Sequence, residues 1–316
     1  MHALTIVCPV DYSDCSKRAL RYAGALTDHF GARLVVLHVF DPLLASAAQL
    51  HQFQLLGEDG QRELAVFVEE HLSRELRRSS RLEQVLTVGA AGSQIVELAT
   101  RRAADLVVMG THGFSGVRKA FFGSTLQAVL RTIRIPVLAV PLVDHRQAAI
   151  RAPLIAAGPV LAPVDFSPES EAAARAAAGL AGALHVPLAL LHVVEPAARV
   201  ARGWQYAAAA GDRTAVQDPA MRMSELAESI GPGSDVVTYI LHGDPAEIIA
   251  RQAREKHAAL IVMSLGSSAR GGRPPGSIAY RVLCLAPVPV LAIAETAAGH
   301  AYVAHLHQQA GAVDAR

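Results

Sequence analysis

Short apolar runs rich in β-branched residues alternate along this chain with longer segments in which apolar residues recur at helical spacing. This alternation is typical of βαβ units, in which helices cover both faces of a parallel sheet. In the first half it predicts strands at 4–9, 33–39, 82–88, 105–109 and 136–140, and helices at 14–30, 60–79, 92–103 and 123–133. In the second half it predicts strands at 158–163, 187–193, 235–241, 259–263 and 289–293, and helices at 168–184, 219–230, 245–257 and 276–285.

The two halves are related in sequence. Pro9-Val10-Asp11-Tyr12-Ser13 returns as Pro163-Val164-Asp165-Phe166-Ser167, and Leu37-His38-Val39 returns as Leu191-His192-Val193, both at an offset of 154 (165 − 11 and 192 − 38). We therefore predict one domain at 1–143, a linker at 144–152, a second domain at 153–295, and a tail at 296–316 outside the repeat. The connection 41–58 fits neither a solvated loop nor a helical period, and it stays unassigned.

Composition and charge narrow the class of protein. A chain of 316 residues with 52% hydrophobic content can bury two cores. Because 29 Lys and Arg face 28 Asp and Glu, there is no electrostatic reason to expect nucleic acid or an anionic membrane surface as a partner. Three cysteines in unrelated contexts form neither a disulfide framework nor a metal motif, and an odd number of thiols fits a reducing compartment.

Two apolar stretches could suggest a leader or a membrane helix, and both are interrupted. The stretch at 3–10 contains Pro9 and is followed at once by Asp11, unlike a signal peptide. The stretch at 172–194 contains Arg175 and Pro187, which suits a buried helix, a turn and a strand better than a membrane span. We expect a cytoplasmic protein without a membrane partner.

A glycine-rich loop, from Gly110 to Ser124, follows the apolar strand that ends at Met109. Its glycines leave the backbone open to phosphate oxygens, and its last residues begin a helix whose N-terminus favours an anion. In an open parallel sheet, ligands bind beyond the carboxyl ends of the strands where the strand order reverses. The predicted nucleotide site comprises Asp11, Val39, Met109, Gly110, His112, Gly113, Arg118, Gly123, Ser124 and Thr125, with Lys119 near it.

Several of these residues have a second interpretation. Asp11 alone is equally typical of a turn or a helix cap. Basic residues on loops are usually solvated, which applies to Arg118 and Lys119. Loop packing explains His112 as well as a ligand contact does. The combination of glycines, the Ser-Thr pair and the place after a fourth strand is what favours phosphate binding.

Other polar residues are assigned structural roles. His38 and His192 lie at matching strand ends, where we expect them to satisfy local hydrogen bonds rather than to act in catalysis. The basic run at 71–78 has helical spacing, so we expect a solvated helix face with Leu72 and Leu76 turned inward.

At these positions the chain resembles the universal stress protein family, whose phosphate loop reads G-x2-G-x9-G followed by Ser or Thr. Gly110, Gly113, Gly123 and Ser124 match its fixed positions, and the resemblance covers nearly all of both halves, as in tandem two-domain members. It implies an α/β fold of two tandem flavodoxin-like (adenine nucleotide alpha hydrolase-like) domains. Each would be a five-stranded parallel sheet of order 3-2-1-4-5 with helices on both faces.

The resemblance also implies ligand contacts. Asp11 would contact ribose or adenine, the Val39 backbone would read the adenine edge, and the loop would hold the phosphates of ATP. Mg²⁺ or Mn²⁺ would then be bound by the phosphates, with no direct ligand from the protein. Family members pair through the fifth strand, so 136–140 and 289–293 would pair inside this chain as an internal pseudo-dimer, and a homodimer of whole chains remains open.

The loop of the second half departs from the motif. If Met263 matches Met109, Ser264 replaces the first glycine and the loop is one residue short, since Gly276 follows Gly123 by 153. If Gly266 instead matches Gly113, the nine-residue spacing survives and Met263 takes the first glycine position. Pro274 and Pro275 also remove two N–H donors. The sequence therefore predicts a weaker second site, formed by Asp165, Val193, Gly266, Gly276 and Ser277.

Three functions are compatible with these patterns. The first is an ATP-binding stress-response regulator or resistance factor with its main site in the first domain and no catalytic residue. The second is a slow ATPase or a nucleotidyl-transfer enzyme, although Val10-Asp11-Tyr12-Ser13 stands where such relatives carry a glycine-rich loop. The third is a scaffold without nucleotide, which suits the second half better than the first. We expect at most weak ATP hydrolysis.

Overall fold

The computed structural model describes residues 4–41, 53–112, 123–142, 158–195, 218–230, 235–266 and 276–294. The predicted linker at 144–152, the tail at 296–316, and the loop residues Gly113, Arg118 and Lys119 lie outside the described residues.

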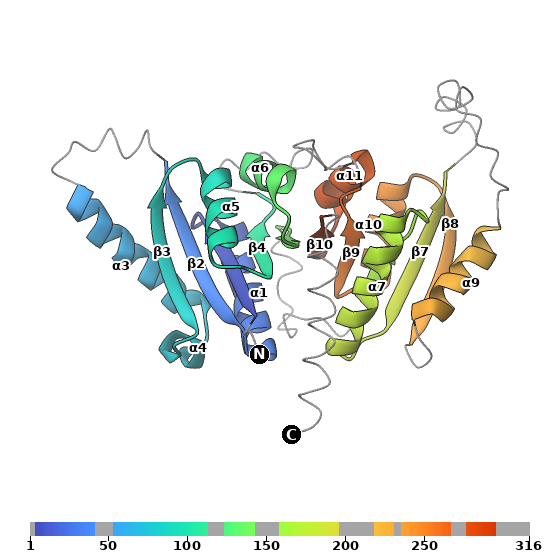
Figure 1. Ribbon diagram of the computed structural model, residues 1–316, viewed down its shortest axis with the longest axis horizontal. Coiled ribbons are helices and arrows are strands. Elements are labelled where there is room, and N and C mark those ends of the chain that lie inside the picture. The colour runs from blue at the N-terminus through green and yellow to red at the C-terminus, as the bar shows by residue number, and fades with distance from the viewer. Residues whose placement is uncertain are drawn as a thin grey trace.

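One ten-stranded sheet runs through both halves, in the order β3-β2-β1-β4-β5-β10-β9-β6-β7-β8 (Figure 1). Each half has the expected strand order 3-2-1-4-5, with parallel neighbours. The two fifth strands pair antiparallel, with Leu291 opposite Leu138, so the predicted pairing inside the chain is present. The strands are β1 (Thr5–Val10), β2 (Arg33–Phe40), β3 (Leu82–Val88), β4 (Leu106–Gly110), β5 (Val137–Val140), β6 (Val160–Pro163), β7 (Leu188–Val194), β8 (Val236–His242), β9 (Leu260–Ser264) and β10 (Val290–Ile293).

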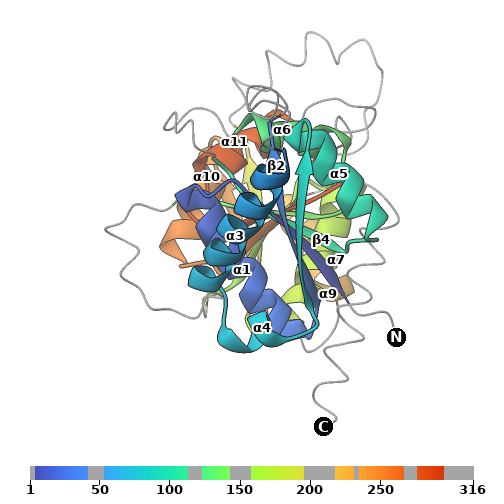
Figure 2. The same cartoon turned by 90° about the vertical axis from the view of Figure 1, so that its left-hand side faces the viewer.

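The helices form two layers, one on each face of the sheet (Figure 2). One face carries α1 (Asp14–Phe30), α3 (Phe53–His71), α4 (Arg74–Arg78), α7 (Pro168–Ala183) and α9 (Pro219–Ile230). The other carries α5 (Ala91–Arg101), α6 (Ser124–Thr132), α10 (Pro245–Glu255) and α11 (Ser277–Leu285). Among the described helices, none is both long enough and apolar enough to cross a membrane.

The central strands are apolar on both faces because both faces are covered. In β1, Ile6 and Cys8 pack beneath α1, while Val7 faces the layer of α5 and α6. The edge strand β3 is only partly buried along its length. This difference explains why the central strands are continuous apolar runs, and it places their carboxyl ends between two helix layers.

The predicted helix at 60–79 is wrong in two respects: its start lies earlier, at Phe53 in the connection left unassigned, and two helices occupy the range. α3 ends at His71, and α4 begins after Ser73, whose hydroxyl accepts a hydrogen bond from the N–H of Leu76 at 3.2 Å. A serine that caps the next turn offers the backbone an alternative to a continuous helix. Leu72 and Leu76 are both buried, as predicted.

Candidate functional site

A cavity of about 310 Å³ opens beyond the carboxyl ends of β1, β2 and β4. These are the strands at which the order of the sheet reverses, the usual place for a ligand in such folds. The structure brings together at its wall Asp11, Val39, Met109, Gly110, His112, Gly123, Ser124 and Thr125. Every predicted residue of the first site that lies in the described ranges is therefore at this cavity.

The turn between β1 and α1 holds the carboxylate of Asp11 in place. Its Oδ1 accepts hydrogen bonds from the N–H of Ser13 at 3.1 Å and from the Ser13 hydroxyl, and Ser13 in turn caps α1. Tyr12, between them, has a left-handed φ of 64°. Asp11 is thus a turn residue and also lines the cavity, so its two interpretations describe one arrangement.

Two helices begin at the cavity without a side-chain cap. Gly123 is the N-cap of α6 and Ala90 that of α5, and neither position carries a capping hydrogen bond from a side chain. Their first residues, Ser124 and Ala91, both line the cavity. Uncapped first-turn N–H groups and the positive ends of two helix dipoles make this wall suitable for an anion.

Gly110 has a packing reason to be glycine. A Cβ at this position would lie 2.9 Å from Cβ of Cys15 and 3.0 Å from its carbonyl carbon, so β4 and the start of α1 approach too closely for a side chain. The sequence explained this glycine by phosphate access alone. Close packing of the two elements adds a requirement that holds with or without a ligand.

The histidines divide between the two interpretations. His38 places Nδ1 2.9 Å from the carbonyl oxygen of Val10, and His192 places Nδ1 2.8 Å from that of Val164, so their structural role is confirmed. His112 lines the cavity, and its Nδ1 lies 2.8 Å from the hydroxyl of the buried Thr111. His112 is therefore positioned by packing and still belongs to the cavity wall.

The second half forms a cavity of about 280 Å³ at the equivalent place. The predicted residues of the weaker site, Asp165, Val193, Gly266, Gly276 and Ser277, all line it. Together with them lie several residues that sequence reasoning did not select, among them Glu195, Pro245 and Ser264.

Strand pairing settles the alignment of the two loops. Met263 pairs with Ala292 as Met109 pairs with Ala139. The N–H of Gly276 donates to the carbonyl of Leu265 at 3.1 Å, as Gly123 donates to Thr111 at 2.7 Å. Ser264 therefore stands in place of Gly110, and the alternative match of Gly266 with Gly113 is wrong, because Gly266 takes the place of His112.

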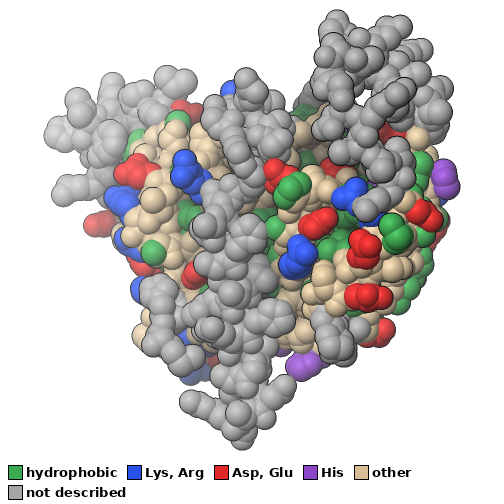
Figure 3. Space-filling view, turned by 45° about the vertical axis from the view of Figure 1, so that its right-hand side comes forward, with side chains coloured by type: hydrophobic (Ala, Val, Ile, Leu, Met, Phe, Trp, Pro, Cys, Tyr) green, Lys and Arg blue, Asp and Glu red, His purple; other side chains and the backbone are tan. Residues whose placement is uncertain are grey.

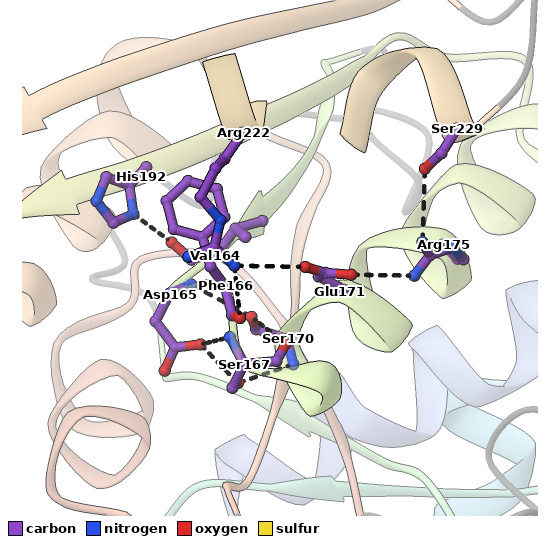
Figure 4. A network of polar contacts seen from close by, with 10 residues as sticks. All are labelled: Val164, Asp165, Phe166, Ser167, Ser170, Glu171, Arg175, His192, Arg222 and Ser229. Atoms are coloured by element: carbon purple, nitrogen blue, oxygen red, sulfur yellow. Dashed lines mark hydrogen bonds and ion pairs between the residues drawn. The ribbon is translucent and has the colours of Figure 1, made fainter. Parts of the chain in front are cut away.

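A polar network fixes the turn that carries Asp165 (Figure 4). Arg222 on α9 donates to the carbonyl of Phe166 at 3.2 Å and lies 4.3 Å from the centroid of its ring. Asp165 accepts from the N–H of Ser167 at 3.0 Å and from its hydroxyl at 2.6 Å. Desolvation raises the pKa of Asp165, but the hydrogen bonds from Ser167 and Ser170 outweigh desolvation and hold that pKa below the ordinary value of an aspartate.

The sequence predicted the helices that follow the edge strands β3 and β8, but not that these helices begin at the two cavities. Ala91 begins α5 and Pro245 begins α10, and each lines its cavity. The repeat relates the two positions, since 245 − 91 is also 154. In the sequence, this offset was the available signal that the two helix starts occupy equivalent places. Within the described part of the chain, no three His, Cys, Asp or Glu side chains gather as they would to hold a metal.

The family model described as the universal stress protein family matches residues 3–141 and 157–294. The chain belongs to the universal stress protein family. It contains the family domain twice, in tandem, as its sequence predicted. The predicted domain limits themselves stay predictions.

Single-domain relatives match about one half of this universal stress protein. One from Thermus aquaticus is 33% identical over 149 residues, covering 43% of this chain and 97% of the relative. One from Methanocaldococcus jannaschii is 31% identical over 140 residues, covering 43% and 80%. A solved universal stress protein from Archaeoglobus fulgidus covers 94% of this chain and 100% of its own, with a TM-score of 0.65 at 19% identity. That structure shows the same fold across both halves.

Proposed function

We propose that the first cavity binds ATP and that the protein is a cytoplasmic, nucleotide-dependent regulator or stress-resistance factor. One observation carries the proposal: two helix N-termini without side-chain caps open onto the cavity of the first half, and the Asp11 carboxylate lies at the same cavity. The helix ends favour the phosphates, and the carboxylate can accept hydrogen bonds from ribose hydroxyls.

The lining residues fit the parts of ATP. Asp11 would bind the ribose, and the end of β2 at Val39 would lie against the adenine. Gly123, Ser124 and Thr125 would hold the phosphates through backbone N–H groups and two hydroxyls. Mg²⁺ or Mn²⁺ would be bound by the phosphates. Gly113 and Arg118 belong to this proposed site by sequence alone.

Binding rather than turnover is the proposed activity. The Ser13 hydroxyl donates to Asp11, and the Thr111 hydroxyl lies 2.8 Å from Nδ1 of His112. Neither Ser13 nor Thr111 lines the cavity, and Thr111 is buried, so neither hydroxyl is placed to attack a ligand bound there. We therefore expect hydrolysis of ATP to be weak at most. Steady-state turnover that disappears in an Asp11→Asn variant would favour the enzyme instead.

A pair of matched substitutions tests the site. Gly123 has φ of −56°, which any residue adopts, so Gly123→Leu adds bulk at the start of α6 without backbone strain. The control is Gly182→Leu on α7, where an added Cβ meets nothing within 4 Å. We expect MgATP to bind the wild type and Gly182→Leu equally, and to bind the first cavity of Gly123→Leu at least about tenfold more weakly, a loss of ~1.4 kcal/mol.

Isothermal titration calorimetry measures these affinities, and thermal unfolding checks that both variants fold. Equal affinity in the Gly123→Leu variant would overturn the site assignment. Failure of wild-type protein to bind MgATP at millimolar concentration would overturn the function and favour a scaffold.

A further inference from the structure

We propose that the second cavity selects an uncharged nucleoside over a nucleoside polyphosphate. The proposal rests on the nucleotide function proposed for the first cavity, because it takes the two halves to share the nucleoside part of the site. It differs in assigning the two cavities different ligands.

The nucleoside side of the cavity is repeated in both halves. Asp165 and Val193 line the second cavity as Asp11 and Val39 line the first, and the cavity volumes are similar, about 280 and 310 Å³. The carboxylate of Asp165 is held by the same Ser-centred turn. A ligand that fills the nucleoside part of one cavity therefore fits the other by size.

The phosphate side differs at the helix that follows the third strand. In the first half α5 begins after Ala90 without a side-chain cap. In the second half α10 begins after Asp244, whose Oδ1 accepts from the N–H of Glu247 at 3.2 Å. Its first residue is Pro245, which lines the cavity and has no N–H to offer. One of the two helix ends available to an anion in the first half is thus capped by a carboxylate in the second.

A second carboxylate lines the cavity itself. Glu195 follows β7 and forms part of the wall, whereas its repeat counterpart, Asp41 (195 − 154), does not line the first cavity. Arg281 on α11 bonds Asp244 at 2.6 Å and lies 3.5 Å from Glu247. On the face of the second half that comes forward in Figure 3, acidic side chains outnumber basic ones.

These charges decide the ligand class. Two carboxylates in one partly enclosed cavity repel a polyphosphate, which carries several negative charges of its own. The same carboxylates, Asp165 and Glu195, follow adjacent strands and accept hydrogen bonds, so they suit the two hydroxyl donors of an uncharged ribose. The remaining uncapped helix end, at Gly276, then faces a neutral hydroxyl rather than phosphates.

The test uses the full chain with its first cavity blocked by Gly123→Leu, titrated calorimetrically with adenosine and, separately, with MgATP. We expect adenosine to bind at least about tenfold more tightly than MgATP, the effect of one ~1.4 kcal/mol charge interaction. Adding Glu195→Gln should raise the affinity for MgATP at least about fivefold while changing that for adenosine little, because the amide keeps the shape and removes the charge. Glu225→Gln, on the exposed face of α9, is the control for the loss of one negative charge.

Adding Gly276→Leu to the chain with the blocked first cavity should abolish adenosine binding, which would place that binding in the second cavity. Equal binding of both ligands, no binding of adenosine, or no gain in MgATP affinity from Glu195→Gln would overturn the proposal. The Gly276→Leu variant with an open first cavity, titrated with MgATP, tests the first site separately. If MgATP does not bind this variant, the proposed function is refuted. If MgATP binds it and only the titrations of the blocked chain give another result, only the inference about the second cavity is refuted.

Discussion

Replacing Gly110 with alanine tests whether packing, and not only a ligand, requires glycine at the end of β4. The added Cβ would meet Cβ, the carbonyl carbon and the carbonyl oxygen of Cys15 at 2.9, 3.0 and 3.2 Å. Carbon atoms in contact prefer about 3.5–4.0 Å, so each approach is several tenths of an ångström too short. Two of the three atoms are backbone at the start of α1, and they cannot rotate away.

Overpacking of this kind costs about 1–3 kcal/mol, and the rigid backbone partner places Gly110→Ala toward the upper end, ~2–3 kcal/mol. The matched control is Gly182→Ala, at an exposed helical position where the new methyl group meets nothing within 4 Å. There the loss of unfolded-state entropy should stabilise the protein by about 0.5–1 kcal/mol. The two alanines therefore shift the free energy of unfolding in opposite directions.

Urea unfolding followed by circular dichroism, without nucleotide, measures both shifts. With a slope of about 1–3 kcal/mol per molar urea, Gly110→Ala should lower the unfolding midpoint by roughly 0.7 M or more. A midpoint equal to that of the wild type would refute the packing argument and return Gly110 to a role in ligand access alone. A loss of nucleotide affinity without loss of stability would lead to the same conclusion.

Two further predictions concern the turns after β1 and β6. The Tyr12 hydroxyl is buried and has no hydrogen-bond partner among the described residues, and burial, then Glu63, raises its pKa. Tyr12→Phe, which copies Phe166, should leave stability unchanged or raise it by ~1 kcal/mol in urea unfolding, and a loss above that size would contradict this. Asp165 has a lowered pKa, so it stabilises the fold above pH ~4 and less as pH falls through its folded pKa. As pH falls below ~4, the free energy of unfolding should drop less in Asp165→Asn than in the wild type, by under ~1 kcal/mol. An equal drop in both proteins would refute this prediction.

Much of the fold followed from local pattern. Ser13 and Ser167 marked the starts of α1 and α7, and both side chains cap those helices. The alternation of short apolar runs with helical segments placed the strands of both halves to within about two residues of their bounds, because apolar periodicity is a local property. The break at Ser73 was missed because a cap inside an amphipathic run is decided by competition between two local hydrogen-bonding patterns.

The sequence by itself determined the two repeated α/β domains, the strand ends that meet at each site, and the loop with a complete motif in the first half alone. Only the tertiary structure decided which helix ends reach those sites, because Ala91 and Pro245 come to the cavities through crossovers from edge strands far along the chain. It also decided that Glu195 faces a cavity while Asp41 does not. Local patterns set which elements form, whereas long-range packing sets which charges share a cavity, and ligand choice depends on the second.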